Sequence, residues 1–337
     1  MSIKSPPSVA IISPALASAN NGNWHTARRW AHCLAPRARV EIAPEWRGAG
    51  ADFLIALHAR RSAPSIAAFA ERHPDRPLVV VLTGTDLYRD IATDAAAQRS
   101  LALASRLVVL QAEGVQALPP QYASKTEVIY QSARSLLPGR RSRLHFDLAL
   151  VGHMRPEKDP LTALRALRRL PADLPVRLFH VGGALDPALT AEVAALGAGD
   201  SRYHWLGALS QAATRQRLKR CHLLLLPSLM EGGANVLIEA VTSGVPVLGS
   251  DIAGNRGMLG ADYPGWFAAG DAGGLAALIS RAANDPGYYA TLARRCAEQV
   301  SLFSPARECA DVCRLLENEV SVEANVGLID VKRSGRN

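Results

Sequence analysis

Short, almost entirely apolar runs recur along this chain, and they constrain its fold more than any other feature of the sequence. They lack the alternation of apolar and polar residues that a strand with one solvated face would show. Strands that helices cover on both faces have this composition, so the runs predict parallel sheets. The predicted strands are Val9–Ser13, Phe53–Leu57, Leu78–Leu82, Leu107–Leu110, Val128–Tyr130, Phe146–Gly152, Val176–Val181, Leu223–Leu226 and Val245–Leu248.

Helical patterns separate these runs. Examples are Asn23–Leu34, Leu161–Leu170, Gln211–Cys221 and Asn235–Ser243, and the stretch from Pro286 to Val320 predicts two helices and no strand. Strands that alternate with helices of this length are typical of the α/β class with doubly wound parallel sheets.

The 337 residues suffice for two domains, and the alternation is broken at Ser132–Arg143, which contains Pro138-Gly139 and no apolar periodicity. We therefore expect two Rossmann-like domains, at residues 1–135 and 144–304, joined by a linker at 136–143. Ligands are expected at the carboxyl ends of the strands, in a cleft between the domains. Residues 305–320 are expected to form a helix that can return to the first domain, and residues 321–337 a frayed tail.

The composition favours small anionic ligands over nucleic acid. The net charge is +8, but no dense Lys/Arg run with interleaved aromatic residues occurs, and aromatic residues make up only 5% of the chain. No apolar run reaches the roughly 18 residues that a membrane-spanning helix needs, and the start of the chain lacks a secretory apolar core. We expect a cytoplasmic protein without a membrane span; the sequence leaves its oligomeric state open.

The five cysteines are Cys33, Cys221, Cys296, Cys309 and Cys313. Their odd number and the absence of a C-x-x-C pair favour a reducing compartment and argue against a zinc ribbon or a disulfide scaffold. Cys309 and Cys313 share a helical face and are predicted to be small buried residues, with a redox-active thiol pair as the alternative.

The most informative motif is Glu231-Gly-Gly-Ala-Asn-Val-Leu-Ile-Glu239, which follows a predicted strand and opens a helix. Glu231 is expected in the loop and Glu239 about one turn inside the helix, with Asn235 as the predicted N-cap. Glycines allow a ligand to approach the backbone closely, and free N–H groups at a helix start suit a phosphate. A sugar nucleotide needs such amides for its diphosphate and carboxylates for its hydroxyls. A capped helix start with two solvated acids is the alternative.

A second motif, Gly152-His153-Met154-Arg155-Pro156-Glu157-Lys158, follows the first predicted strand of the second domain. Cations at the carboxyl end of a strand can neutralise a departing diphosphate, and Arg155 and Lys158 are the candidates. The alternative is a solvated loop charge.

Three polar loops follow predicted strands of the N-terminal half, and we expect them to bind the acceptor or another anion. The first contains Asn20, Gly22, Asn23, His25 and Thr26, the second His58 and Arg60, and the third Thr85 and Asp86. The alternatives are asparagine-rich turns, a structural histidine at position 58 and a helix cap at the third loop.

Together these motifs resemble the GT-B fold glycosyltransferases of the large retaining family four, from about Val9 to Val320. The resemblance implies two Rossmann-like domains that face a central cleft. It implies that Glu239 binds the ribose of a uridine nucleotide, that Glu231 holds the transferred sugar and that Lys158 binds the diphosphate. Sugar and phosphate oxygens would meet backbone amides of the donor-binding set Gly232, Gly233, Ala234, Asn235 and Val236. His153 stands where the family usually has an arginine, and Arg155 is expected to replace it.

The polar loops, read together with Gly152–Lys158, resemble a narrower group, the selenosugar synthases of selenoneine biosynthesis. This resemblance implies that selenophosphate attacks C1 of UDP-N-acetylglucosamine or UDP-glucose and gives a 1-selenosugar and UDP. An anionic nucleophile needs no general base but does need cations, for which His25, Arg28 and Arg60 are candidates. The donor sugar, the anomeric configuration and the step that separates selenium from phosphorus stay open.

No Asp-x-Asp motif occurs, and cations with a helix start can stabilise a leaving UDP, so we expect neither a metal nor a cofactor. One alternative is a family-four transferase with a hydroxyl acceptor such as a lipid or glycan, for which Asn23–Leu34 would be a basic membrane-binding helix. Another is a two-lobed solute-binding protein without catalytic activity. A Rossmann oxidoreductase is disfavoured because Val181-Gly182-Gly183 lacks the third glycine.

Overall fold

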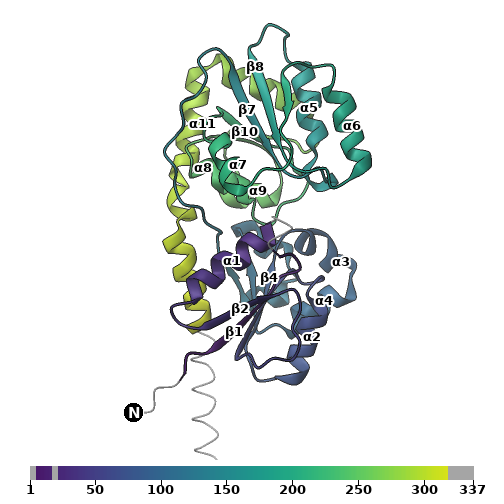
Figure 1. Cartoon of the computed structure of the whole chain (residues 1–337), viewed down its shortest axis with the longest axis vertical. Coiled ribbons are helices and arrows are strands. Elements are labelled where there is room, and N and C mark those ends of the chain that lie inside the picture. Colours follow the sequence, from purple (N-terminus) through teal and green to yellow (C-terminus); the bar gives the residue numbers. More distant parts are fainter. Residues whose placement is uncertain (1–4, 17–21, 318–337) are drawn as a thin grey trace, which may run out of the picture. The chain divides into compact units, whose positions relative to one another are not determined.

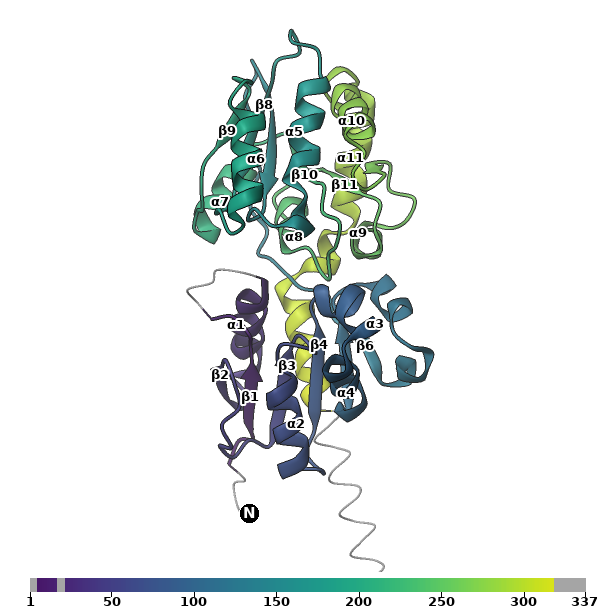
Figure 2. The same cartoon turned by 90° about the vertical axis from the view of Figure 1, so that its right-hand side faces the viewer.

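The computed structural model describes residues 5–16 and 22–317, and these residues divide into two compact units. The first is built from Met1–Leu110, Val115–Ile129 and Pro305–Asn337, as far as these ranges are described. The second is built from Gln111–Gly114 and Tyr130–Ser304. Each unit contains one six-stranded sheet with helices on both faces (Figures 1 and 2).

All strand pairs of the first sheet are parallel, in the order β2-β1-β3-β4-β5-β6. The strands are β1 (Ser8–Ile12), β2 (Arg39–Ala43), β3 (Phe53–Leu57), β4 (Leu78–Leu82), β5 (Arg106–Val109) and β6 (Thr126–Val128). The side chains of β3 alternate between two cores: Ile55 and Leu57 point to one face, and Leu54 and Ala56 to the other. The central strands are therefore apolar at every position, which is the pattern that the sequence showed.

Helices cover both faces of this sheet. Helices α1 (Gly22–Leu34) and 305–317 pack on the face of Ile55, while α2 (Ala63–Arg72) and α4 (Ala95–Leu103) pack on the face of Leu54. Shorter elements complete the unit: η2 (Asp86–Asp90), α3 (Ile91–Thr93), η3 (Ala112–Ala117), which both units share, and η4 (Pro120–Lys125).

The second sheet is also parallel throughout, in the order β12-β11-β10-β7-β8-β9. Its strands are β7 (Phe146–Val151), β8 (Val176–Val181), β9 (Tyr203–Trp205), β10 (Leu223–Leu226), β11 (Val247–Ser250) and β12 (Trp266–Phe267). Its helical elements are η5 (Pro156–Lys158), α5 (Pro160–Arg169), α6 (Pro187–Gly197), α7 (Gln211–Leu218), α8 (Asn235–Val241), α9 (Ala253–Leu259), α10 (Ala272–Asn284), α11 (Pro286–Glu298) and η6 (Val300–Phe303).

Aspartate N-caps fix where several of these helices begin. The carboxylates of Asp159, Asp186 and Asp285 accept from the backbone N–H three residues further on, and a proline follows each aspartate. Such a pair satisfies one free amide of the first turn and fixes the backbone angle of the first helical residue.

The sequence located the central strands and missed three of the four edge strands. The predictions for β3, β4, β8 and β10 agree with the structure to the residue, and the other predicted strands shift by one or two residues. Strand β2 (Arg-Val-Glu-Ile-Ala) was missed because it alternates polar with apolar residues at the open edge of its sheet. Strands β9 and β12 were missed because they are too short to give a pattern.

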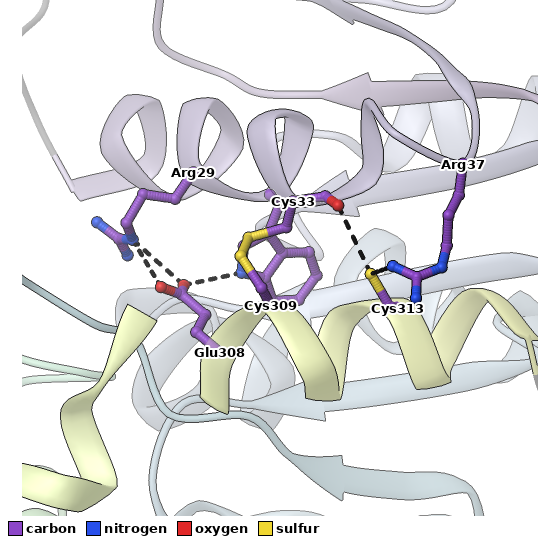
Figure 3. Close-up of a disulfide and its surroundings, with 7 residues drawn as sticks. Arg29, Cys33, Arg37, Glu308, Cys309 and Cys313 are labelled. Atoms are coloured by element: carbon purple, nitrogen blue, oxygen red, sulfur yellow. Dashed lines mark hydrogen bonds and ion pairs between the residues drawn. A yellow bond between two sulfur atoms is a disulfide. The ribbon is translucent and has the colours of Figure 1, made fainter. Parts of the chain in front are cut away.

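The structure corrects the prediction that Cys309, like Cys313, is a small buried residue, because Cys309 is half-buried and bonded in a disulfide. Cys33 of α1 and Cys309 of the helix 305–317 form one across 276 residues of sequence, because both helices pack on the same face of the first sheet (Figure 3). Around it, the buried carboxylate of Glu308 accepts from Arg29 Nε and from Trp30 Nε1, and Cys313 accepts from Arg37 Nη1 at 3.0 Å. Cys313 is a buried thiol, as predicted.

Reduction of the disulfide is expected to destabilise the first unit by about 2–4 kcal/mol. The reason is that the unfolded chain gains conformational entropy when its two cross-linked segments are released. In calorimetry, dithiothreitol should lower the melting temperature of the wild-type protein. Cys33→Ala should start at the lower temperature and show no response to dithiothreitol. An equal response of both proteins would contradict this role for the disulfide.

Candidate functional site

The strand order of the second sheet brings two of the predicted motifs together. The chain enters at β7, runs outward through β8 and β9, and then returns to the opposite side of β7 with β10. Leu150 pairs with Leu225, so β7 and β10 end at the same level and their following loops leave together. Backbone N–H of Leu229 donates to the carbonyl of Glu157 at 2.9 Å and joins the two loops. A ligand crevice forms at such a reversal of strand order.

Lys158 and Glu231 form an ion pair at this point. Lys158 Nζ donates to Glu231 Oε1 at 2.6 Å, and the side chains are 21% and 8% exposed. Ser228 Oγ donates to the same oxygen, also at 2.6 Å. A charge-assisted contact at this depth is stronger than a surface ion pair. Among the described residues, Glu231 Oε2 takes no hydrogen bond, so this oxygen is the one left for a ligand.

The backbone of Glu231 is held by residues that the sequence analysis did not select. A Cβ at Gly254, in the first turn of α9, would lie 1.9 Å from the carbonyl oxygen of Glu231, so only glycine fits there. Ser250 Oγ donates to the carbonyl of Ser228, and Asn255 Nδ2 donates in turn to the carbonyl of Ser250 at 2.9 Å. The cluster of small residues after β11 was the available signal, but nothing in the sequence shows what it touches.

Helix α8 begins at Asn235, and its N-cap is Ala234, which makes no side-chain cap hydrogen bond. This corrects the prediction of Asn235 as the N-cap. Val236 and Gly232 are buried and Gly233 is half-buried. Glu239 lies one turn inside the helix, as expected, and is 7% exposed. Its Oε1 accepts from Gln211 Nε2 at 2.7 Å.

The loop Gly152–Arg155 is fixed from β8. Gly183 N donates to His153 Nδ1 at 2.9 Å, and Met154 N donates to the carbonyl of Gly183. A Cβ at Gly182 would lie 1.8 Å from the carbonyl oxygen of Gly152. Gly182 is therefore explained by this close backbone contact, and no dinucleotide-binding role is needed to account for it. Arg155 is half-buried and lies one residue before η5.

His180 of β8 fixes this loop through a hydrogen bond to its backbone. Its Nε2 lies 3.2 Å from the carbonyl oxygen of Gly152, so this nitrogen carries the proton, and its Nδ1 accepts from the Tyr203 hydroxyl at 2.8 Å. Burial lowers the pKa of His180 from 6.5 to about 4, since the charged ring would lose its hydration. His180 is therefore neutral at pH 7.

We expect His180 to make the protein less stable in acid. Between its unfolded pKa near 6.5 and its folded pKa of about 4, the unfolded chain binds a proton that the folded chain does not. Stability from this residue is complete above about pH 6.5 and falls by up to roughly 3 kcal/mol as the pH drops to about 4. Urea unfolding should therefore show a smaller pH dependence in His180→Gln than in wild type. Equal dependence in both proteins would contradict the assignment.

In the first unit, the loop after β1 and the start of α1 carry the first predicted acceptor set. Asn20 lies outside the described residues. Gly22 and Asn23 begin α1, and the Thr26 hydroxyl is buried and donates to the carbonyl of Gly22 at 2.8 Å. Burial, followed by the charges of Arg29 and Arg28, lowers the pKa of His25 below 6.5. This lowered pKa weakens the case for His25 as a cation, and its role in acceptor binding stays a prediction.

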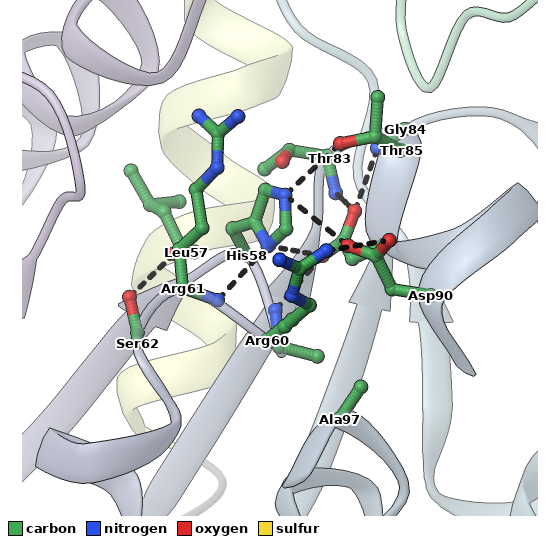
Figure 4. Close-up of polar contacts among 12 residues, drawn as sticks. Leu57, His58, Arg60, Arg61, Ser62, Thr83, Gly84, Thr85, Asp90 and Ala97 are labelled. Carbon is green, nitrogen blue, oxygen red and sulfur yellow. Dashed lines mark hydrogen bonds and ion pairs between the residues drawn. The ribbon is translucent and has the colours of Figure 1, made fainter. Parts of the chain in front are cut away.

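The second and third predicted loops meet at the carboxyl ends of β3 and β4 (Figure 4). His58 is buried and has a φ of 74°, a left-handed conformation that is rare for residues other than glycine. The backbone N–H of Arg61 donates to His58 Nδ1 at 3.2 Å, so the neutral ring carries its proton on Nε2. Nε2 in turn donates to Thr85 Oγ1 at 3.0 Å. Burial lowers the pKa of His58, which keeps the ring neutral.

Asp86 fixes both loops instead of facing a ligand. It is 0% exposed, and its carboxylate accepts from the backbone N–H groups of Thr83, Gly84 and Ala59, each at 2.9 Å. These bonds correct the expectation of a direct contact between Asp86 and an acceptor.

Of the residues predicted in these two loops, Arg60 is the cation; its side chain is 51% exposed and pairs with Asp90 and Asp94. The carboxylate of Asp90 is buried; its Oδ1 is shared by Arg60 and Arg89, and its Oδ2 lies 3.9 Å from His58 Nε2 without a hydrogen bond. The sequence analysis missed Asp90 because it lies one turn beyond the polar loop, within η2. The arrangement offers an exposed guanidinium beside the half-buried Thr85 hydroxyl, whose oxygen accepts from His58.

No helix within the described ranges has both the length and the apolar character that crossing a membrane requires. In residues 5–16 and 22–317, His, Cys, Asp and Glu side chains form no group of three or more that would hold a metal ion.

Residues 145–300, most of the second unit, match the family model described as glycosyl transferases group 1. The crystal structure of Anabaena HepE in complex with UDP and glucose is similar over 93% of this chain and 100% of that chain, with a TM-score of 0.74 and 18% identity. A sucrose-phosphate synthase from Thermosynechococcus elongatus is similar over 94% and 100%, with a TM-score of 0.76 and 16% identity. The pneumococcal O-GlcNAc transferase GtfA in complex with UDP and GlcNAc is similar over 80% and 57%, with a TM-score of 0.66 and 17% identity.

Likeness at this level of identity shows the fold. The two parallel six-stranded sheets with flanking helices are the Rossmann-like units of the GT-B architecture, which confirms the predicted fold class. The family match supports the predicted glycosyltransferase family through the second unit.

Proposed function

We propose that this chain is a glycosyltransferase that uses a UDP-sugar and, more specifically, a selenosugar synthase that joins the selenium of selenophosphate to C1 of that sugar. The observation that carries the proposal is the Lys158–Glu231 pair at the strand reversal of the unit that matches the glycosyltransferase model. Similar folds were solved with UDP and a sugar, which supports a UDP-sugar as donor.

The pair gives each charge a task in the transfer. When the bond between C1 and the diphosphate oxygen breaks, UDP leaves with the electron pair and gains negative charge. Lys158 would exchange Glu231 Oε1 for a diphosphate oxygen, with Arg155 and the amides at Gly232–Asn235 as further donors. Ser228 would still hold Glu231 Oε1, so the carboxylate would stay in place to accept from the sugar hydroxyls through Oε2. Glu239 would accept from the ribose.

The first unit favours an anionic acceptor. His58 is buried and neutral, and its Nε2 proton is already donated to Thr85 Oγ1, so this nitrogen cannot remove a proton from a hydroxyl. Selenophosphate needs a cation and a donor, which Arg60 and the Thr85 hydroxyl would supply, with His58 orienting Thr85. It needs no base because it arrives as an anion. Its selenium would form the bond to C1 as the bond to UDP breaks. These charges do not call for a metal ion, and we propose that none is required.

The helix that suggested a lipid acceptor does not present the expected surface. Trp30 of α1 is fully buried, and its Nε1 donates to Glu308, while Arg29 forms an ion pair with the same carboxylate. An amphipathic membrane-binding helix would expose its aromatic and basic side chains. Trp30 and Arg29 are therefore not available to a lipid surface. By contrast, Arg28 is exposed and Trp24 is half-buried. A glycan acceptor does not depend on this helix.

The deciding experiment mixes the enzyme, UDP-N-acetylglucosamine or UDP-glucose, and fresh selenophosphate without added metal. Mass spectrometry then follows the selenium isotope pattern. We expect a selenium-bearing sugar and an equal amount of UDP. UDP release without such a sugar would overturn selenophosphate as the acceptor. UDP binding without any turnover would favour the hydroxyl-acceptor alternative.

We expect Lys158→Met to lower kcat by about 10²–10³-fold, because a positive charge at the departing diphosphate stabilises the transition state. The KM for selenophosphate should change little, since Lys158 belongs to the donor site. Lys219→Met, at the end of α7 in the same unit, is the matched control and should keep wild-type turnover. Retained turnover in a folded Lys158→Met protein would remove Lys158 from the mechanism.

A further inference from the structure

Helix α7 contributes a side chain to Glu239 that no motif indicated. Gln211 is the first residue of α7, and its Nε2 donates to Glu239 Oε1 at 2.7 Å. Ser210 caps the helix by accepting from Ala213 N, and this bond fixes the start of α7 at Gln211. The contact joins two helices that are 28 residues apart in the sequence.

Glu239 itself has a rigid backbone but a side chain that needs an external partner for its orientation. Every residue of α8 from Val236 to Val241 is buried, so the helix is fixed by the core. A glutamate carboxylate can still rotate about its terminal torsion, which is broad. The amide of Gln211 restricts this rotation through its hydrogen bond to Oε1.

The chemistry of the partner also matters. The nearest cation on α7 is Arg215, one turn after Gln211, and its Nη2 donates elsewhere, to the carbonyl of Arg134 and the hydroxyls of Thr242 and Ser243. The charge of Glu239 attracts that of Arg215, but the hydrogen bond from α7 to Glu239 Oε1 comes from a neutral amide. An amide orients the carboxylate without removing its charge, whereas a bonded guanidinium would compete with the hydroxyl groups of a ligand.

We propose that Gln211 is a positioning residue for ribose recognition: by fixing Oε1 of Glu239, it aims the carboxylate at the 2′ and 3′ hydroxyls of the nucleotide. This inference rests on the proposed function, in which Glu239 binds the ribose.

Calorimetric titration with UDP and with 2′,3′-dideoxyuridine diphosphate tests the proposal, because the second nucleotide lacks both hydroxyls. In Gln211→Leu, UDP affinity should fall about tenfold, as expected for a lost hydrogen bond to a charged group, and affinity for the dideoxy nucleotide should not change. Gln216→Leu is the matched control, since Gln216 is an exposed glutamine on the same helix, and it should bind both nucleotides like wild type.

A double-mutant cycle separates positioning from packing. In the Glu239→Gln background, Gln211→Leu should have no further effect on UDP binding, because this background has no carboxylate for Gln211 to orient. Should Gln211→Leu fail to fold, Gln211→Asn withdraws the amide by one methylene group with little change in polarity and should show the same selectivity loss.

Three results would overturn the inference: equal losses for both nucleotides, no loss for UDP, or additive effects of the two substitutions. A wild-type protein that binds neither nucleotide would overturn the proposed function itself. The two failures are therefore distinguishable. If wild type binds UDP more tightly than the dideoxy nucleotide and one of the three results is found, only the inference about Gln211 fails.

Discussion

The reversal of strand order between β7 and β10 is the constraint on which the candidate site depends. It places two loops from distant parts of the sequence beside each other, and the Lys158–Glu231 ion pair closes the contact at 2.6 Å. Neither charge would be stable at this depth alone, because burial removes hydration that only an opposite charge and hydrogen bonds can replace. The pair therefore holds the two loops together and concentrates opposite charges at this point.

Small and neutral groups hold this charged pair in place. Gly254 allows α9 to touch the backbone of Glu231, Ser228 fixes one carboxylate oxygen, and neutral His180 supports the neighbouring loop through the carbonyl of Gly152. None of them carries a charge that would neutralise Glu231. The first unit uses a buried carboxylate for the same purpose: Asp86 accepts three backbone amides and so fixes the loop that carries His58 in its left-handed conformation.

The sequence was most informative where burial dictates composition. Strands β3 and β4 were located to the residue, since a strand covered on both faces is apolar throughout. It was least informative where one residue type serves several roles. Asp86 looked like a ligand-binding residue but serves as a structural anchor. Cys33 and Cys309 looked like unrelated thiols but form a disulfide, since a spacing of 276 residues contains no signal of contact.

By itself, the sequence determined the α/β class, the loops that follow each strand and the residue types at the carboxyl ends, because hydrophobic periodicity and turn chemistry are local properties. Only the tertiary structure decided which loops are neighbours. It paired Lys158 with Glu231 and Gln211 with Glu239, and it assigned the proton of His58 to Nε2 through the amide of Arg61. The physical reason is that strand order, helix docking and hydrogen-bond direction depend on contacts between segments far apart in the chain, which no local pattern encodes.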